Sequence, residues 1–319
     1  MSKNFILSIC IPTYNRATYL AATIFSIACQ QRFIDTNDVE IIVSDNCSTD
    51  NTQQTVLKLI EIHGGKIKYF RNQENILDLN FEKSLSLGSG EFLKLNNDSL
   101  KHNENSLDKM IHLIKSNLHE RNILFFLNGC AEVKGNVLIR DLNGFIEKVS
   151  YWGGWIGAFG IWKNDFVNMA EFSRYSKLQL VQVDVLLRLI TSGKNLLINN
   201  EILFTSIAPA NKGGYNLLTV FLDNYFFILS EEVKLNHLSK RIFKFEKKKI
   251  LLQFICPWLV EFKMSPDKYF FELDNTYRKI FRHFKYDIFT VIKFIFKFCA
   301  LFCYRKLKNV SAINGKLKN

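Results

Sequence analysis

The stretch VEIIVSDNCSTDNT, residues 39–52, joins a short apolar run to a polar tip, and this combination indicates the fold class. The apolar half predicts a buried strand. Ser48, Thr49 and Asp50 are well placed to cap a helix over residues 52–64. Asp45 is not needed as a cap, so we expect its carboxylate to be free to face a ligand. A strand that leads through polar residues into a helix is the repeating unit of α/β sheets.

The same unit recurs on both sides of this stretch. In the preceding helical pattern, Leu20, Ile24 and Ile27 fall on one face. The elements expected around residues 39–52 are a strand at 5–15, a helix at 17–30, a strand at 66–73, a helix at 77–90 and a strand at 91–98. Alternating strands and helices with short connections predict a mostly parallel sheet covered on both faces.

Each of the four expected strands ends in polar residues. The tips read PTYNR at 12–16, SDNCSTD at 44–50, RNQEN at 71–75 and NND at 96–98. In open α/β sheets ligands bind at the carboxyl ends of the strands. We therefore expect the four tips to converge on one edge of the sheet and to form the functional site there.

The rest of the chain continues the alternation and then changes character. Further elements are expected as a helix at 106–118, strands at 122–129 and 136–142, an aromatic and glycine-rich stretch at 150–166, a helix at 180–193 and a strand at 195–206. Beyond about residue 215 the pattern is helical. Residues 231–319 hold 20 Lys and Arg against 8 Asp and Glu, whereas residues 1–230 hold 22 of each. The basic region predicts an anionic partner.

Composition limits the class of protein. Hydrophobic residues make up 48% of 319 residues, enough for a substantial core. The seven cysteines are an odd number without zinc-type spacing. No secretory signal pattern is visible at the start. We expect a protein of the reducing cytosol.

Four pieces, at residues 8–20, 41–52, 71–98 and 181–189, resemble the family 2 glycosyltransferases. These are inverting enzymes of the GT-A fold that use nucleotide-sugar donors. The sequence is most similar to members that build bacterial O-antigen or capsule, including abequosyltransferase-like enzymes. The resemblance covers about residues 5–215 and implies three parts: a nucleotide-sugar-binding half at 1–100, an acceptor-binding and catalytic half at 101–215, and a helical, basic, membrane-associating extension at 216–319.

The resemblance also implies roles for individual residues. Asp45 matches the acid that contacts the nucleotide base, Asp98 and Asn96 the outer positions of a DxD metal motif, and Asp184 the catalytic base. The donor-binding set that it implies is Pro12, Thr13, Tyr14, Arg16, Asp45, Arg71, Asn75 and Asn97, to which Lys212 adds a charge that offsets the diphosphate. The chain departs from the family at Leu77, where Gly is usual, at Gln182 and Val183, where a second acid is usual, and near 205–215, where a His is often found.

A Mg²⁺ or Mn²⁺ ion is implied at Asp98. Such ions take oxygen ligands and are commonly held by one or two carboxylates together with phosphate. One carboxylate, the donor's phosphate oxygens and an amide oxygen of Asn96 or Asn97 meet that requirement, with weaker metal affinity than two acids give. The alternative is that residues 96–98 form only a polar turn.

Three other features have a functional and a structural interpretation. Trp152, Trp155 and Tyr215 are expected to bind the acceptor sugar, or else to be core aromatics. Asp184 is expected to take the acceptor hydroxyl proton, or else only to favour the start of its helix. The segment 286–308 is expected to lie in a lipid interface with Thr290, Lys293 and Lys297 on its polar face, or else to pack on the protein.

The sequence thus predicts a peripheral enzyme at the inner face of the cell membrane. It would move a sugar, most simply from a UDP-sugar, to a lipid-linked saccharide, without a nucleic-acid partner. Two alternatives remain open: a nucleotidyltransferase or other nucleotide-binding α/β protein, and an inactive membrane-bound relative. The first would show a glycine-rich phosphate loop, which residues 12–17 lack.

Overall fold

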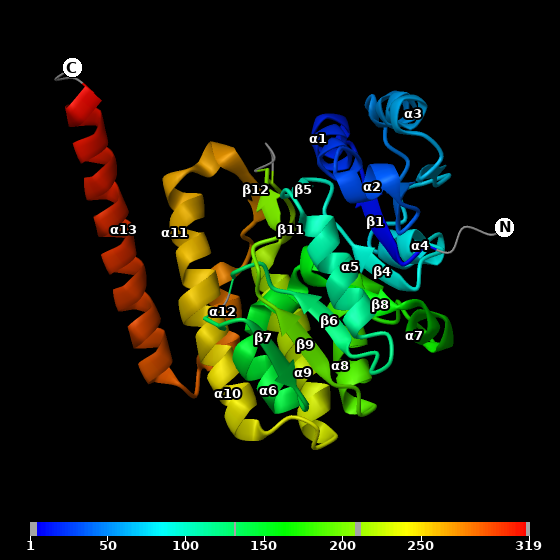
Figure 1. Ribbon diagram of the computed structural model, residues 1–319. Helices are drawn as coiled ribbons and strands as arrows, with labels where there is room; N and C mark the ends of the chain where they lie inside the picture. Colours follow the sequence, from blue (N-terminus) through cyan, green and yellow to red (C-terminus); the bar gives the residue numbers. More distant parts are fainter. Residues whose placement is uncertain (1–4, 131, 208–211, 317–319) are drawn as a thin grey trace. The chain divides into compact units, whose positions relative to one another are not determined.

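The computed structural model describes residues 5–130, 132–207 and 212–316, with Lys212 and residues 309–316 described by their backbone alone. The chain divides into two compact units, Met1–Pro209 and Ala210–Asn319, and each is described here by itself. The first unit contains both the nucleotide-binding and the acceptor-binding stretches expected from the sequence. The basic extension expected from residue 216 lies within the second (Figure 1).

The first unit is built on a five-stranded sheet with the order β3-β2-β1-β4-β8. Its strands are β1 (Leu7–Thr13), β2 (Val39–Asp45), β3 (Ile67–Arg71), β4 (Phe92–Leu95) and β8 (Gly160–Trp162). The first four pair in parallel and β8 runs antiparallel to β4. Every residue of β1 and β2 is buried, as continuous apolar strands of a covered sheet require. The mixed, mostly parallel sheet predicted from the sequence is confirmed.

Helices cover this sheet and connect its strands. In the first unit they are α1 (Ala17–Ala28), α2 (Gln31–Asp35), α3 (Thr52–His63), α4 (Leu79–Ser86), α5 (Ser106–Ser116), α6 (Leu142–Lys148), α7 (Lys163–Asn168) and α8 (Val181–Thr191). Leu20, Ile24 and Ile27 of α1 are fully buried, which confirms the predicted apolar face. Helix α4 packs on β1, β2 and β4, while α1 and α3 pack on each other.

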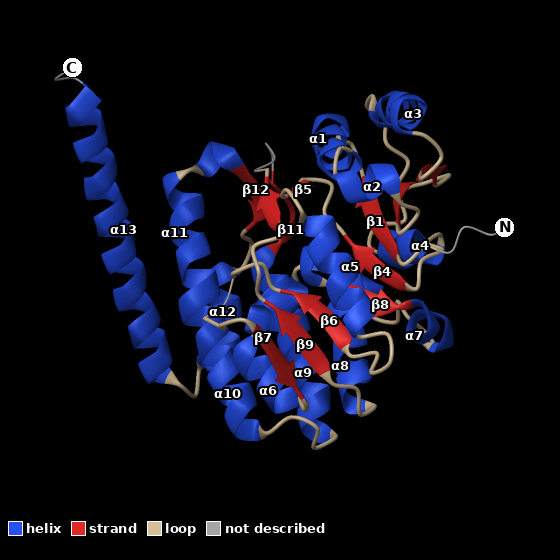
Figure 2. Cartoon of the chain, viewed as in Figure 1, coloured by secondary structure: helices blue, strands red, loops and turns tan. Residues whose placement is uncertain are grey.

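Two smaller sheets complete the first unit (Figure 2). One holds β6 (Ile123–Phe126), β9 (Leu196–Asn199) and β7 (Asn136–Ile139), and the other pairs β5 (Leu100–His102) with β10 (Phe204–Ser206). The single strand predicted at 195–206 is therefore two strands. Asn200 causes the break, because its side chain donates to the Val133 carbonyl and accepts from Gly129 N–H, which turns the chain between the two pairings.

The second unit is mainly helical, as predicted. It contains α9 (Tyr225–Lys234), α10 (Lys240–Lys249), α11 (Cys256–Met264), α12 (Thr276–Phe284) and α13 (Ile288–Lys316), with π-helical turns at Thr219–Asn224 and Ile250–Ile255. A parallel pair of strands, β11 (Lys212–Asn216) and β12 (Tyr269–Glu272), was not predicted. Aromatic side chains pack against one another in this region: Phe262 stacks on Phe271 at 4.9 Å between ring centroids, and Trp258 meets Tyr269 edge to face at 5.4 Å.

The long helix α13 packs along α11 with one side (Figure 1). Thr290 and Phe294 on that side are 2% and 6% exposed, while Phe289 and Phe296 on the other are 75% and 72% exposed. The predicted polar face was wrong, because Thr290 is buried whereas Lys293 is exposed among the outward-facing aromatic residues. Over the described part of the chain, no helix has the length and apolarity needed to span a bilayer.

Candidate active site

The strand ends of the first unit meet along one edge of the sheet. The parallel registers set Thr13 beside Asp45 and Asp45 beside Arg71. From the fourth strand end, Asp98 accepts a 3.1 Å hydrogen bond from the Thr13 hydroxyl at its Oδ2, and its carbonyl accepts one from Thr23 at 2.8 Å. The convergence of the four polar tips predicted from the sequence is therefore found.

The first two tips are bonded to each other. Asn15, with a left-handed backbone at φ 51°, accepts at its side-chain oxygen from Thr49 N–H at 2.7 Å. Its own N–H donates to the Ser48 hydroxyl at 2.8 Å. Pro12 and Thr13 are buried beneath this junction. Tyr14 is 43% exposed, so its side chain is open to a ligand.

Asp45 is fully buried at the end of β2. Its Oδ2 accepts a 2.5 Å hydrogen bond from the Tyr69 hydroxyl, and its Oδ1 accepts from Ser48 N–H at 2.9 Å. The expectation that this carboxylate is free was therefore wrong, because the loop that follows β2 folds back on it. Together the hydroxyl and the carboxylate connect β3 to β2, and burial, together with the hydrogen bond to Asp45, raises the pKa of Tyr69.

The third tip is held by side-chain amides. Asn46 donates to the Asn75 side-chain oxygen at 2.7 Å, and Asn72 donates to Asn80 at 2.9 Å. Arg71 is exposed and donates to the Ser48 carbonyl at 2.9 Å. Leu77 replaces the family's usual Gly with a left-handed backbone at φ 51° and an outward side chain that is 73% exposed. Leu77 thus adopts the left-handed backbone conformation that favours glycine.

The fourth tip contains two amides with different surroundings. Asn96 is fully buried, and its amide donates to the carbonyls of Asn97 and Leu100 while its oxygen contacts His102 Nε2 at 3.1 Å. The side-chain oxygen of Asn97 accepts from the Trp155 indole N–H at 3.0 Å. Asn96 thus shapes the loop from inside, and its metal-binding role stays a prediction.

Asp98 lies in this loop without a fully compensating partner. Burial raises the pKa of its carboxyl from 3.8 to about 6, although the charge of Arg16 and hydrogen bonds from Thr13 and Ser99 act in the opposite direction. A carboxyl whose charged form is poorly stabilised favours an added cation. The described residues contain no cluster of three or more His, Cys, Asp or Glu that could hold a metal. A hard cation at Asp98 therefore fits only if donor phosphates supply further oxygens.

The aromatic and glycine-rich stretch lies against this loop. It forms 3₁₀ turns at Ser150–Gly154 and Ile156–Ala158 before β8. Trp152 and Trp155 are half-buried and meet edge to face at 6.4 Å between centroids. Gly157 permits the contact with the loop, because a Cβ there would come within 2.8 Å of both the Asn97 side-chain oxygen and the Trp155 ring. Trp162 differs, since it is 1% exposed and belongs to the core.

Beneath the loop, Lys94 of β4 is fully buried. Its Nζ donates to the carbonyls of Leu95 at 2.9 Å and Gly157 at 2.7 Å and lies over the Phe204 ring. Burial lowers the pKa of this amine from 10.5 to about 7. Lys94 thereby links the metal-motif loop to the aromatic stretch from inside.

Helix α8 carries Asp184 in its first turn, as predicted. Gln182 of the same turn donates to the Gly154 carbonyl at 2.6 Å, so this helix start adjoins the aromatic stretch. Asp184 itself is 1% exposed. Arg174 Nη2 donates to its Oδ1 at 2.6 Å and Nε lies 3.1 Å from both oxygens, while Arg188 pairs with Oδ2 at 3.0 Å. The carboxylate is thus held between two guanidinium groups.

Two predicted residues lie in the second unit. Lys212 and Tyr215 are both in β11. The side chain of Lys212 lies outside the described residues. Tyr215 meets Phe271 edge to face at 5.0 Å between centroids. Their roles at a donor or acceptor site stay predictions.

Several residues that organise the site were not identified from the sequence. Tyr69 could have been found from its position opposite Asp45 once two parallel strands were aligned. Arg174 gave no signal, because it lies in an irregular segment ten positions before Asp184. Asn46, Asn72 and Asn80 stand in polar tips where many side chains are equally suited to hydrogen bonding.

Comparison with known proteins agrees with this geometry. Residues 8–140 match the family model described as Glycosyl transferase family 2. An 88-residue segment is 41% identical to abequosyltransferase RfbV of Salmonella typhimurium, covering 27% of this chain and 26% of that protein. A 169-residue segment is 35% identical to the GalNAc(5)-diNAcBac-PP-undecaprenol beta-1,3-glucosyltransferase of Campylobacter jejuni, covering 52% of this chain and 48% of that protein. The chain thus spans about half or less of the length of these curated relatives.

Solved structures establish the fold. The mannosyltransferase PcManGT of Pyrobaculum calidifontis, in complex with GDP-Man and Mn²⁺, superimposes with a TM-score of 0.56 at 13% identity over 95% of this chain and 88% of that one. Residues 1–349 of TarS from S. aureus with UDP-GlcNAc give 0.55 at 17% identity over 79% and 72%. At these identities the likeness concerns the fold alone, which is the GT-A fold. Together with the family match, it follows that residues 8–140 are a domain of glycosyl transferase family 2.

Proposed function

We propose that this protein is an inverting glycosyltransferase that moves a sugar from a nucleotide-diphospho-sugar, in the first instance a UDP-sugar, to a lipid-linked saccharide during bacterial surface polysaccharide synthesis. The observation that carries the proposal is Asp98, a half-buried carboxyl in the turn after β4 that accepts a hydrogen bond from Thr13 at the end of β1. The O-antigen and lipid-linked character of the acceptor follows the names of the two curated relatives.

Donor binding is assigned to the loops around Asp98. Tyr14 and Arg71 are exposed, and Arg16 is half-buried close enough to act on the Asp98 charge. A ring and two guanidinium groups suit a nucleotide base and a diphosphate. Asp45 is assigned an indirect part, because its oxygens already hold Tyr69 and Ser48. A base contact at Asp45 requires the ligand to share those oxygens.

Asp98 is the residue that would hold a divalent cation, and a side-chain amide oxygen of the same loop would be the second ligand from the protein. When bound, Mg²⁺ or Mn²⁺ neutralises the charge that develops on a departing nucleoside diphosphate. Asn97 is better placed than Asn96, because its oxygen accepts one hydrogen bond from Trp155 and keeps a second lone pair, whereas Asn96 is fully buried against His102.

Asp184 is the proposed general base for the acceptor hydroxyl, and Trp152 with Trp155 forms the proposed sugar-binding wall. The geometry sets a condition on this role. Arg174 covers both oxygens of Asp184, so it must turn away before the carboxylate accepts a proton. Arg174 is suited to such a movement because its side chain is 36% exposed, whereas that of Arg188 is 20% exposed and also binds backbone carbonyls.

Peripheral membrane association is assigned to the outward face of α13. Phe289, Phe296 and Leu307 there are 75%, 72% and 69% exposed, and Lys293 and Lys306 lie between them. Aromatic side chains with interspersed lysines suit the headgroup region of an anionic bilayer. Flotation with phosphatidylglycerol vesicles tests this role. Replacing Phe289 and Phe296 by Glu should abolish flotation, whereas Phe245→Glu on α10, at a site 56% exposed, should not.

UDP release tests the central proposal. The purified protein is incubated with a panel of nucleotide sugars and Mn²⁺, and slow release of the free nucleotide diphosphate is followed with and without EDTA. One donor should stand out, and Asp184→Asn should lose transfer to a saccharide acceptor while still binding UDP. Absence of release from every donor, with intact UDP binding, would instead support the inactive relative. Release of pyrophosphate from a nucleoside triphosphate would support a nucleotidyltransferase.

A further inference from the structure

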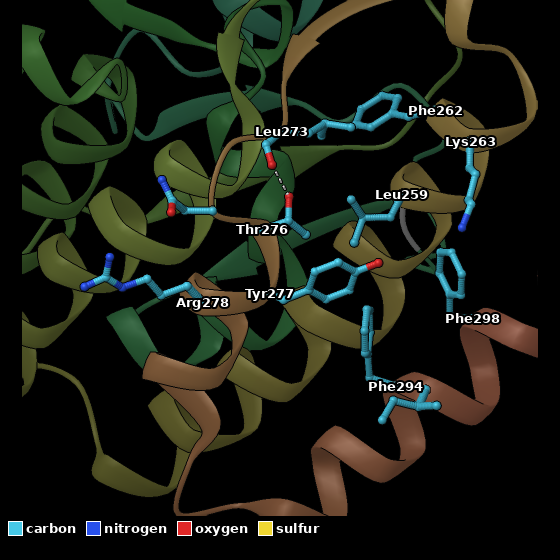
Figure 3. A pocket seen from close by; sticks show the side chains of 11 residues that line it. Leu259, Phe262, Lys263, Leu273, Thr276, Tyr277, Arg278, Phe294 and Phe298 are labelled. Atoms are coloured by element: carbon cyan, nitrogen blue, oxygen red, sulfur yellow. Dashed lines mark hydrogen bonds between the residues drawn. The ribbon is translucent and has the colours of Figure 1, made fainter.

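The second unit contains an apolar pocket that the proposed chemistry does not use. It has a volume of about 630 Å³, within the range of small-molecule sites. Its walls come from α11, from the first turn of α12 with the residues just before it, and from α13 (Figure 3). Leu259, Phe262 and Phe294 form a buried floor, and the half-buried Phe298 and exposed Tyr277 stand nearer the surface. Among the described residues that line it, none is an Asp or a Glu.

Cations stand at the border of this pocket. Lys263 lies over the rings of Phe298 and Phe302, at 5.9 and 5.6 Å from their centroids. Arg278 lines the pocket with its stem, while its guanidinium points away from Tyr277 (Figure 3). Arg278 also lines a second hollow of about 550 Å³ together with Lys279, Arg282 and Lys285, and no Asp or Glu is among its described lining residues. The two hollows therefore share a wall.

The charge around them is incompletely balanced. Asp223 pairs with Lys279 at 3.1 Å, with Arg282 and with His283, and these contacts lower its pKa. Within the described part of the chain, Lys263, Arg278 and Lys285 have no carboxylate partner. Their surplus charge remains available for an anion. An apolar cavity that adjoins a basic hollow is complementary to an amphiphile with a hydrocarbon chain and an anionic head.

We propose that the apolar pocket binds the hydrocarbon chain of a lipid diphosphate and that the adjoining basic hollow binds its diphosphate. The occupant is the carrier portion of the lipid-linked acceptor, so the inference rests on the proposed function and adds a binding site to it. A diphosphate fits better than one phosphate because several cations converge on the hollow, and bidentate Arg contacts favour phosphate oxygens. The site would retain the acceptor by its carrier, independently of the sugar that is transferred.

Titration calorimetry on the full chain, without any donor, tests this directly. Farnesyl diphosphate is the probe because it joins a short apolar chain to a diphosphate. It should bind, and farnesol and inorganic diphosphate should each bind at least tenfold more weakly, since each retains half of the contacts. Tyr277→Glu should weaken binding of both farnesyl compounds at least tenfold, whereas Arg278→Glu should weaken farnesyl diphosphate and leave farnesol unchanged.

Two matched variants control for charge and surface position. Tyr304→Glu places a carboxylate on α13 at a site 64% exposed, and Arg241→Glu reverses a charge on the exposed side of α10. Both should bind farnesyl diphosphate as the unaltered protein does. Because the four substituted residues are partly or fully exposed, the circular dichroism spectrum should not change. A pocket variant that binds normally would overturn the proposal.

Other outcomes also contradict it. If farnesyl diphosphate does not bind, or if inorganic diphosphate binds as tightly as farnesyl diphosphate, the proposed lipid site is ruled out. Displacement of the probe by phosphatidylglycerol vesicles identifies a membrane phospholipid as the occupant instead. These measurements do not depend on catalysis. If the protein releases UDP but does not bind the probe, only the lipid site is contradicted. If it binds the probe but transfers no sugar, the proposed function is contradicted.

Discussion

Asp98 and Asp184 both lie in the first unit, Asp98 half-buried and Asp184 1% exposed, and their carboxylates have opposite surroundings. Asp184 is clamped between Arg174 and Arg188, so its charge is balanced inside the protein. Asp98 accepts hydrogen bonds from the hydroxyl groups of Thr13 and Ser99, and the charge of Arg16 also stabilises its carboxylate. Burial nevertheless raises its pKa to about 6. Strongly perturbed groups concentrate at functional sites. The difference indicates that Asp98 lacks a positive partner that the donor complex would bring, whereas Asp184 already has two.

Removing Asp184 should have the largest effect on stability. Asp184→Ala leaves two guanidinium groups without their carboxylate, and breaking a buried pair in this way costs about 3–5 kcal/mol. Asp165→Ala is the matched control, because Asp165 has a single partner, Lys194, whose side chain is 30% exposed, and its loss should cost about 1 kcal/mol. Urea denaturation measures both. Equal losses in the free energy of unfolding would show that the pairing of Asp184 with two arginines stabilises the protein no more than a single ion pair does.

Replacing Asp98 should affect activity and stability in opposite directions. Asp98→Asn should slow UDP release by about 10²–10³-fold, the usual effect of losing a group that stabilises transition-state charge. The same change should stabilise the ligand-free protein by about 1–3 kcal/mol at pH 7.5, because it removes a charge that burial disfavours.

Asp78→Asn provides the comparison for this variant. Burial also raises the pKa of Asp78 to about 6, so it should stabilise the protein similarly. It has no assigned part in the reaction, and UDP release should therefore be unchanged. An Asp98→Asn protein that keeps its full rate in Mn²⁺ would remove the proposed metal ligand.

Gly157 tests whether the contact between the Asp98 loop and the aromatic stretch matters. Gly157→Ala introduces a Cβ within 2.8 Å of Asn97, Leu100 and Trp155 atoms. Overpacking of this kind costs about 1–3 kcal/mol and should raise the KM for the acceptor more than that for the donor. Gly65→Ala meets no atom within 4 Å and should be near neutral. Thermal melts and acceptor titrations distinguish the two glycines.

The smallest expected effect is the pH dependence of cation binding. The pKa of Asp98 is raised by folding from 3.8 to about 6, so the ligand-free protein loses stability as the pH rises between those values. Cation binding requires the charged form and should change in the opposite sense. At pH 6 half of the molecules are protonated, so affinity for Mn²⁺ should be about twofold below its value at pH 8. Mn²⁺-induced shifts in Tm measure this, and Asp98→Asn should show none.

The sequence predicted those parts of the fold that depend on local periodicity. The four strands from β1 to β4 and the helices α1, α3 and α4 were predicted because apolar spacing and polar tips repeat within short windows, whereas the short helix α2 was missed. The separation of β9 from β10 and the pairing of β11 with β12 were missed, since each depends on a partner far away in the chain. Leu203 and Phe204 look like a continuation of β9, but Phe204 pairs with His102.

The candidate site shows the same limit. The sequence placed Asp184 correctly in the first turn of its helix and Asp98 at the fourth strand end, although the strand stops at Leu95 and Asp98 lies in the turn that follows. Neither the ion pair with Arg174 nor the bond from Tyr69 to Asp45 was predicted. Both depend on side chains that approach through tertiary structure. A carboxylate in a sequence motif does not reveal whether its charge is already balanced, and here that balance distinguishes the two acids.

Because its amine is buried, Lys94 should release a proton when the chain folds. An ordinary lysine is fully protonated at neutral pH, but at a pKa of about 7 this one is only about half protonated there. Folding at pH 8 therefore releases close to one proton into the buffer, and the native chain carries slightly less charge than its formal +12. Refolding heats measured in phosphate and in Tris should differ by the number of protons released times the difference between the ionisation enthalpies of the two buffers, and Lys94→Met should remove this difference.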